Sequence, residues 1–193
     1  MPQLTDDCFA QGGKMMTVAE ALAVIDAVAK PVTDGEPVDL GRAAGRILAE
    51  DVIADHDVPP HDNAAVDGYA VFFDDLDGAG ETRLPVGGRI AAGHSLGRAA
   101  RRGEALRIFT GAPMPSGPDT VMMQEDCSVD GDHVIILPGI KRGSNRRGAG
   151  EDIAAGSVIL RRGRRLKPQD IGLAASAGRS RLNVHGRLRV ALF

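Results

Sequence analysis

The sequence predicts a mixed, β-rich α+β fold, and three observations support this prediction. Glycine and proline are abundant, with 25 and 11 copies in 193 residues, which is typical of short strands joined by tight turns. Short apolar runs follow one another through the middle of the chain. Apolar residues at helical spacing occur in a segment near each end.

The first expected element is a helix over 17–30. Thr17, followed by Glu20 three residues later, has the pattern of a capping box. Apolar residues recur at helical spacing within the segment, and Pro31 is expected to end it. Residues 1–14 are expected to be a disordered leader.

A second, shorter helix is expected within 41–54, because Ala43, Ile47 and Leu48 would share one helical face. From about residue 52 the pattern changes to short apolar runs separated by Gly, Pro and Asp. Such runs are typical of strands joined by tight turns. The runs cover 68–73, 83–93, 104–115, 119–126 and 133–140.

The last part of the chain returns to mixed structure. A strand is expected around 158–160, and a helix over 168–177. Pro168 suits the first turn of that helix, and Gly178 suits its C-terminal cap. The final apolar run, 187–193, is expected to begin another strand.

The helical segments toward the two ends enclose the β-rich middle, which predicts an inserted domain. Residues 15–60 together with 146–178 would form a discontinuous, elongated linker or dimerisation domain. Residues 61–145 would form the inserted β-rich domain. Residues 179–193 would belong to a further domain.

Composition excludes several classes of protein. The apolar fraction of 43% is enough for a core, and the formal charge of −3 favours solubility. Cys8 and Cys127 are far apart and have no zinc-site or disulfide spacing, so a cytoplasmic setting is expected. No apolar run reaches the length of a membrane span, and no membrane partner is expected.

Polar residues gather in the stretch 59–71. Asp62 and Asn63 follow two prolines that keep the backbone extended, and they could cap backbone groups in a turn. Asp67-Gly68 is a common hairpin dipeptide. Alternatively, Asp62 and Asp67 present carboxylates of the kind that hold a hard cation. The residues alone leave both interpretations open.

A second candidate is the stretch 110–119. Thr110 offers a hydroxyl at the end of an expected strand, and Gly111 could leave a backbone amide open to close approach. Exposed amides and hydroxyls bind oxyanions well. A simple turn rich in proline and glycine is the alternative.

The third candidate is the glycine-rich stretch 139–156, in which a basic cluster is followed by two acids. Such a cluster favours phosphate or another anion, although a solvated, charged surface is the alternative. Nucleic acid is not expected as a partner, because stacking aromatics are absent from the stretch and the chain is acidic. The residues are Lys141, Arg142, Arg146, Arg147, Glu151 and Asp152.

These stretches occur together and in order, and in this combination the sequence resembles the MoeA family of molybdopterin molybdenumtransferases, whose eukaryotic relatives include the gephyrin E domain. The resemblance extends from Met16 over almost all of the remaining chain. The matching stretches are "DVPPHDNAAVDGYAV", "RIFTGAPMPSGPDTVMMQED", "GSNRRGAGEDIAAGSVI" and "RLRVALF".

The resemblance implies a fold of bifurcated, coiled β-sheets with an inserted β domain. It also implies an enzyme of molybdenum cofactor biosynthesis. The family inserts molybdenum from molybdate into adenylylated molybdopterin and releases AMP, and its elongated subunits form homodimers. Residues 179–193 would then hold the first strand of a pterin-binding α/β domain.

By motif position, Asp67, Thr110 and Asp152 match residues implicated in the activity of the family. Asp62 and Asn63 lie in the same first motif. Gly111, Arg146 and Arg147 complete the expected substrate-binding set. Because molybdate is a dianion that carboxylates repel, we expect Mg²⁺ between it and the carboxylates of Asp67 and Asp152. Thr110 would orient an oxyanion or phosphate by hydrogen bonding.

Two departures from the family pattern matter. Many members have Ser-Ala-Met where this chain has Ala64-Ala65-Val66, so one hydroxyl is lost. The Ser-Thr-Gly-Asp-Glu stretch that follows "RVALF" in the family is absent from this sequence. The chain alone is therefore expected to be inactive. The alternative function is a non-catalytic scaffold for dimerisation or protein interaction.

Overall fold

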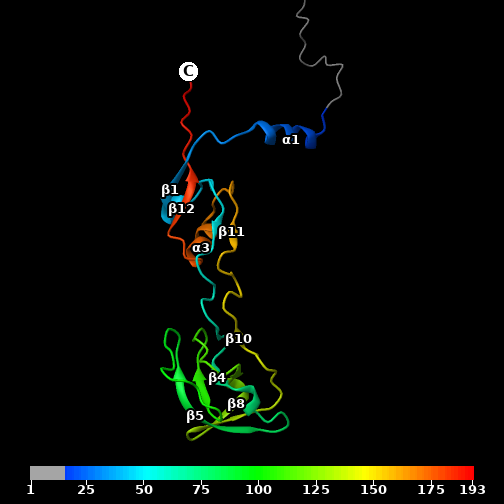
Figure 1. Ribbon diagram of the computed structural model, residues 1–193, viewed down its shortest axis with the longest axis vertical. Helices are drawn as coiled ribbons and strands as arrows, with labels where there is room; N and C mark the ends of the chain where they lie inside the picture. Colours follow the sequence, from blue (N-terminus) through cyan, green and yellow to red (C-terminus); the bar gives the residue numbers. More distant parts are fainter. Residues whose placement is uncertain (1–15) are drawn as a thin grey trace, which may run out of the picture.

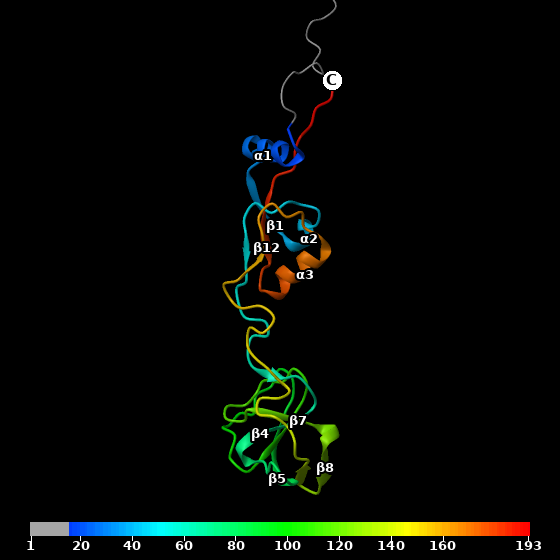
Figure 2. The ribbon, with the colours of Figure 1, turned by 90° about the vertical axis from the view of Figure 1, so that its right-hand side faces the viewer.

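A computed structural model describes residues 16–193, which form two lobes on one long axis (Figure 1). The upper lobe lies near the C-terminal segment, and the lower lobe holds the main sheet. Two crossing segments, near residues 54–60 and 150–156, join the lobes, as both ribbon views show (Figures 1 and 2). The expected leader and Cys8 lie outside the described residues.

Helix α1 (Val18–Val28) begins as the sequence predicts. The Thr17 hydroxyl accepts the amide of Glu20 at 3.2 Å, and the Glu20 carboxylate accepts the amide of Thr17 at 2.7 Å. The capping box is therefore confirmed. No residue of α1 is buried, and the helix projects away from the upper lobe (Figures 1 and 2).

The upper lobe combines two short antiparallel strand pairs with two helices. Strand β1 pairs with β12, and β2 pairs with β11. Their apolar side chains share one core with the helices, which includes Leu48, Leu166 and Val184. The bounds are β1 (Gly35–Asp39), α2 (Leu40–Ala43), β2 (Val52–Ile53), β11 (Val158–Leu160), α3 (Pro168–Ser176) and β12 (Arg181–His185).

The expected helix over 168–177 is confirmed as α3. Pro168 is its first residue, where a missing N–H costs nothing. Gly178 follows with a φ of 93°, in the left-handed region that glycine adopts readily. The expected strand at 158–160 is also confirmed, as β11.

Two expectations for this lobe are wrong. Within 41–54 the only helical residues belong to α2, because Ile47 and Leu48 instead form isolated bridges with Arg165 and Val184. Over 187–193 the backbone forms no strand, since no other described strand lies alongside to pair with it.

The lower lobe is built on a curled six-stranded sheet of order β7-β4-β6-β5-β9-β8. All neighbours are antiparallel except β5 and β6, which are parallel. The sheet buries apolar side chains on both faces, as the alternation of Tyr69, Ala70 and Val71 between two core clusters shows. The bounds are β4 (Gly68–Val71), β5 (Thr82–Ile90), β6 (Ala105–Ile108), β7 (Thr120–Met123), β8 (Cys127–Asp130) and β9 (His133–Ile136).

Four short elements complete this lobe. Strand β3 (Asn63–Ala64) pairs with β10 (Arg146–Arg147), and this pair lies at the end of the lobe that faces the crossing segments (Figure 1). The turns η1 (Phe73–Asp75) and η2 (Gln124–Asp126) follow β4 and β7. Strand β8 was not among the predicted strands. The predicted β-rich α+β class is confirmed, and none of the helices in 16–193 is long and apolar enough to cross a membrane.

Candidate functional site

Strand β3 brings the three predicted polar stretches together. On one side, Asn63 and Ala64 pair with Arg147 and Arg146 of β10. On the other side, the amide of Ala64 donates to the carbonyl of Ala112 at 3.0 Å. The stretches 59–71, 110–119 and 139–156 are therefore contiguous at the end of the lower lobe nearest the crossing segments.

Asp67 and Thr110 are in direct contact. Asp67 Oδ1 accepts the Thr110 amide at 2.8 Å and the Thr110 hydroxyl at 2.7 Å. These two hydrogen bonds lower the pKa of Asp67, with a smaller contribution from the charge of Arg107. Asp67 is therefore held as a carboxylate, and the Thr110 hydroxyl proton points toward it.

The position of Asp67 depends on the glycine that follows it. A Cβ at Gly68 would lie 1.7 Å from the carbonyl oxygen of Met122 in β7. Only glycine therefore allows β4 and β7 to approach this closely. The amide of Gln124 also donates to the Asp67 carbonyl at 3.0 Å, so the backbone of Asp67 is fixed as well as its side chain.

Asp62 connects all three stretches. Its carbonyl accepts the amide of Met114 at 2.9 Å, and its Oδ1 accepts the amide of Ala149 at 2.9 Å. Its other carboxylate oxygen lies 3.7 Å from a guanidinium nitrogen of Arg146. These contacts agree with the interpretation of Asp62 as a residue that caps backbone groups in a turn.

Asp152 is engaged with Arg147 rather than with Asp67 or Thr110. Arg147 Nη2 donates to Asp152 Oδ1 at 2.5 Å, and Arg147 Nε donates to Glu151 at 3.1 Å. Asp152 raises the pKa of Arg147 most strongly, with a further contribution from Glu151. The structure thus brings Asp67 and Thr110 into contact and places Asp152 in a separate ion pair within the adjoining stretch.

For two polar groups the structure decides between alternatives that the residues left open. The Gly111 amide is not free, because it donates to the Ala64 carbonyl at 2.9 Å. Arg142 is not part of an open basic cluster, because it pairs with Asp119 at 2.6 Å and lies 4.8 Å from the centre of the Phe73 ring.

Asn63 presents a polar atom with unmet hydrogen-bonding capacity. Its Oδ1 is shielded from solvent and receives no hydrogen bond from the described residues. A buried amide oxygen without a donor is unfavourable in free energy. Asn63 is thus a site residue whose side-chain oxygen has no donor among residues 16–193.

The side chains of this site do not by themselves fit a magnesium ion. Within residues 16–193, no group of three or more His, Cys, Asp or Glu side chains is placed to hold a metal. Asp67 and Asp152 each already accept hydrogen bonds through Oδ1. Mg²⁺ takes about six oxygen ligands, several of which water and substrate phosphate usually supply, so Asp67 and Asp152 would hold it only together with a bound ligand.

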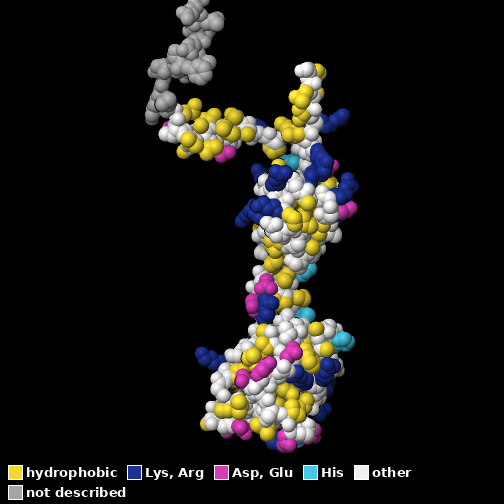
Figure 3. All heavy atoms as spheres, turned by 180° about the vertical axis from the view of Figure 1, so that it is seen from behind, with side chains coloured by type: hydrophobic (Ala, Val, Ile, Leu, Met, Phe, Trp, Pro, Cys, Tyr) yellow, Lys and Arg dark blue, Asp and Glu magenta, His cyan; other side chains and the backbone are white. Residues whose placement is uncertain are grey.

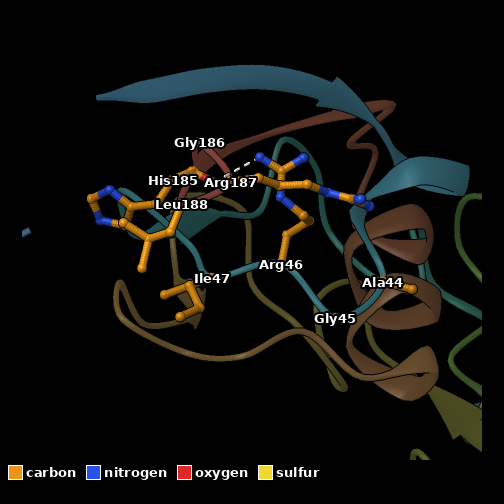
Figure 4. Close-up of a pocket in the computed structure, with 8 residues that line it drawn as sticks. All are labelled: Ala44, Gly45, Arg46, Ile47, His185, Gly186, Arg187 and Leu188. Carbon is orange, nitrogen blue, oxygen red and sulfur yellow. Dashed lines mark hydrogen bonds between the residues drawn. The ribbon is translucent and has the colours of Figure 1, made fainter. Parts of the chain in front are cut away.

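A cavity that the sequence did not indicate lies in the upper lobe (Figure 4). It has a volume of about 400 Å³ and lies between residues 44–47 and 185–188. Arg46 donates to the carbonyl of His185 at 2.7 Å across it. Figure 3 shows Lys and Arg side chains over this lobe. None of the predicted site residues lines the cavity.

The comparison with known proteins matches most of the chain. The family described as "MoeA N-terminal region (domain I and II)" matches residues 16–178. The protein named molybdopterin molybdenumtransferase in Haemophilus influenzae is 38% identical over 161 residues, which are 83% of this chain and 39% of that protein. The protein of the same name in a Nostoc species is 39% identical over 163 residues, or 83% and 37% of the two chains.

A solved structure agrees with the sequence comparison. The crystal structure of a molybdopterin biosynthesis moeA protein from Pyrococcus horikoshii OT3 superposes with a TM-score of 0.78 at 34% identity. The superposition covers 89% of this chain and 46% of that one. The chain therefore spans less than half the length of each of these proteins.

Proposed function

Because the chain belongs to the family of MoeA N-terminal regions, we propose that it forms part of a molybdopterin molybdenumtransferase of molybdenum cofactor biosynthesis. The substrates would be molybdate and adenylylated molybdopterin, and AMP would be released. The observation that best supports this proposal is the Asp67–Thr110 contact at the point where the three polar stretches meet. A cytoplasmic location belongs to the same proposal.

In this proposal Asp67 and Thr110 act as one unit. With its proton directed to Asp67, the Thr110 oxygen presents lone pairs to solvent, so it accepts a hydrogen bond from a ligand donor. The hydroxyl can donate to an oxyanion only after its hydrogen bond to Asp67 has broken. The contribution of this chain would be placement of a ligand by fixed polar groups.

The other site residues have supporting roles in the proposal. Asn63 Oδ1 has no donor among the described residues and is shielded from solvent, so a ligand would reach it only if the neighbouring loops moved apart. Arg146 would contact an anion, because it is only loosely paired within the chain. Its distance to the Asp62 carboxylate is 3.7 Å, whereas Arg147 lies 2.5 Å from Asp152. Asp152 would keep Arg147 in place.

A homodimer is part of the proposal, and α1 supports it. Val18, Leu22 and Ile25 lie on one face of the helix with exposed fractions of 77%, 55% and 54%. Figure 3 shows α1 as a largely hydrophobic rod in contact with solvent. Burial of this face against a second copy of the chain would remove the apolar surface from water.

A non-catalytic scaffold is the second candidate, and one feature favours it. The Asp67 carboxylate, the Thr110 hydroxyl and the Gly111 amide already bond within the chain. Such contacts also suit a purely structural junction of loops. The two candidates differ in whether Asp67 is needed for AMP release.

The test uses the product of the native gene, with adenylylated molybdopterin, molybdate and Mg²⁺, and measures AMP and molybdenum cofactor. Asp67→Asn is expected to lower turnover by at least about tenfold, since a preorganised polar group at a reacting centre contributes that much or more. Asp132→Asn is the control, because the Asp132 side chain is 87% exposed at the β8–β9 turn. Unchanged turnover in Asp67→Asn would remove Asp67 from the mechanism, and no AMP from the wild type would favour the scaffold.

A further inference from the structure

Arg107 lies beside the two chain segments that carry the Asp67–Thr110 pair. Asp67 comes immediately before β4, and Thr110 follows soon after β6. The two strands are antiparallel neighbours, and Arg107 of β6 is opposite Tyr69 of β4. A side chain at this register can therefore contact both segments at once.

The guanidinium of Arg107 bridges two elements that fix Asp67. One nitrogen donates to the carbonyl of Gly68 at 3.2 Å, and the other donates to the side-chain oxygen of Gln124 at 2.6 Å. Gln124 in turn donates its amide to the Asp67 carbonyl at 3.0 Å. Arg107 thus ties the residue after Asp67 to the turn that holds the Asp67 backbone.

Arg107 also contacts the residue before Thr110. Its guanidinium carbon lies 4.7 Å from the centre of the Phe109 ring and 5.2 Å from the centre of the Tyr69 ring. Both distances are within the range in which a cation is attracted to an aromatic ring. The guanidinium is therefore attracted to both rings, one on each of the two chain segments that carry the pair.

From these contacts we infer that Arg107 is the positioning residue that keeps Asp67 and Thr110 together. This inference rests on the proposed function for its catalytic meaning, while the positioning itself is a property of the chain. Lysine could not replace arginine here, since a single ammonium lacks the planar fork that reaches two acceptors and stacks on two rings.

The matched control is Arg89. It lies 4.5 Å from the centre of the Phe109 ring and makes no side-chain hydrogen bond with any residue of 16–193. Arg89→Met therefore removes a cation next to Phe109 and leaves the bridge between Gly68 and Gln124 intact. Arg107→Met also removes a cation next to Phe109, and in addition it removes the bridge between Gly68 and Gln124.

The first measurement is amide hydrogen exchange of the 193-residue chain by NMR. We expect the Thr110 and Gln124 amides to exchange about tenfold faster in both Arg107→Met and Arg107→Lys, a change typical of the loss of a charge-assisted hydrogen bond. In the two Arg107 variants, the amides that bond β5 to β9 should exchange at the wild-type rate. In Arg89→Met, all amides should exchange at the wild-type rate. Unchanged Thr110 exchange, or equal acceleration across the sheet, would overturn the inference.

The second measurement is AMP release by the native gene product. Arg107→Met is expected to lower kcat about tenfold with little change in the KM for molybdate, and Arg107→Lys should not restore kcat. A raised KM with unchanged kcat would overturn the positioning role and assign Arg107 to molybdate binding. A wild-type protein without activity would refute the proposed function, while the exchange data would still decide whether Arg107 positions the pair.

Discussion

The Thr110 amide and the Thr110 hydroxyl donate to the same oxygen of Asp67, at 2.8 and 2.7 Å. Two donors from one residue fix the carboxylate in direction as well as in position. The contact joins positions 43 residues apart in the chain. It is therefore a product of the fold of the lower lobe.

This contact predicts that Thr110 can be replaced only by another hydroxyl residue. Thr110→Val keeps the amide and the shape of the side chain but loses the hydroxyl, so Asp67 loses one of its two donors. AMP release by the native gene product should fall about tenfold or more, as for other preorganised polar groups. Thr110→Ser should retain most of the activity, and equal losses in both variants would show that the hydroxyl is not the important feature.

The sequence was sufficient to predict elements whose signals are local. The Thr17–Glu20 capping box and Pro168 at the start of α3 depend on neighbours within one turn, and both are present in the structure. The contact between Asp67 and Thr110 is a long-range pairing. The resemblance to the family grouped the two residues by motif position, but it did not indicate a direct contact between them.

Long-range pairing also explains what could not be predicted. The sequence left open whether the Gly111 amide is free, and β3 lies alongside so that its Ala64 carbonyl accepts that amide. It also left open whether the cluster that includes Arg142 binds an anion, and the fold places Asp119 next to Arg142. Whether a polar group is free depends on the segment that packs against it, and spacing along the chain does not contain that information.

The misassigned helix over 41–54 leads to a stability prediction. A helix would place Ile47 and Leu48 on one face, whereas here Leu48 is 0% exposed and Ile47 is 44% exposed. Leu48→Ala should lower the free energy of unfolding by about 2–5 kcal/mol. Ile47→Ala should change it by about 0.5 kcal/mol or less. Urea unfolding measures both, and similar losses would support the helical interpretation.

The exposed face of α1 gives a prediction about assembly. Leu22→Lys places a charge in the centre of this face, so we expect the dimer to dissociate to monomers at micromolar concentration. Ala23→Lys adds the same charge on the other side of the helix and should leave the dimer intact. Sedimentation velocity of the 193-residue chain distinguishes the species, and an unchanged dimer in Leu22→Lys would exclude this face as the interface.

The upper lobe should be sensitive to acid because of Asp170 in α3, whose side chain is only 3% exposed. It pairs with Arg164 at 2.9 Å and accepts the amide of Lys167 at 2.9 Å. Arg164 is the main cause of the lowered pKa of Asp170, and the Lys167 amide adds to it. Replacement by Asn should therefore destabilise the chain at neutral pH by about 1–3 kcal/mol, as for a buried hydrogen bond to a charged group.

The sign of the pH dependence follows from the lowered pKa. Stability from ionised Asp170 is fully present above the pKa of an unfolded aspartate, about 4, and is lost as the pH falls through the lower folded pKa. The difference in unfolding free energy between wild type and Asp170→Asn should therefore shrink below about pH 4. Asp39→Asn is the control, because its pair with Arg181 is exposed and should contribute little at any pH. A difference for Asp170→Asn that stays constant or grows in acid would show that the carboxylate is not stabilised by these partners.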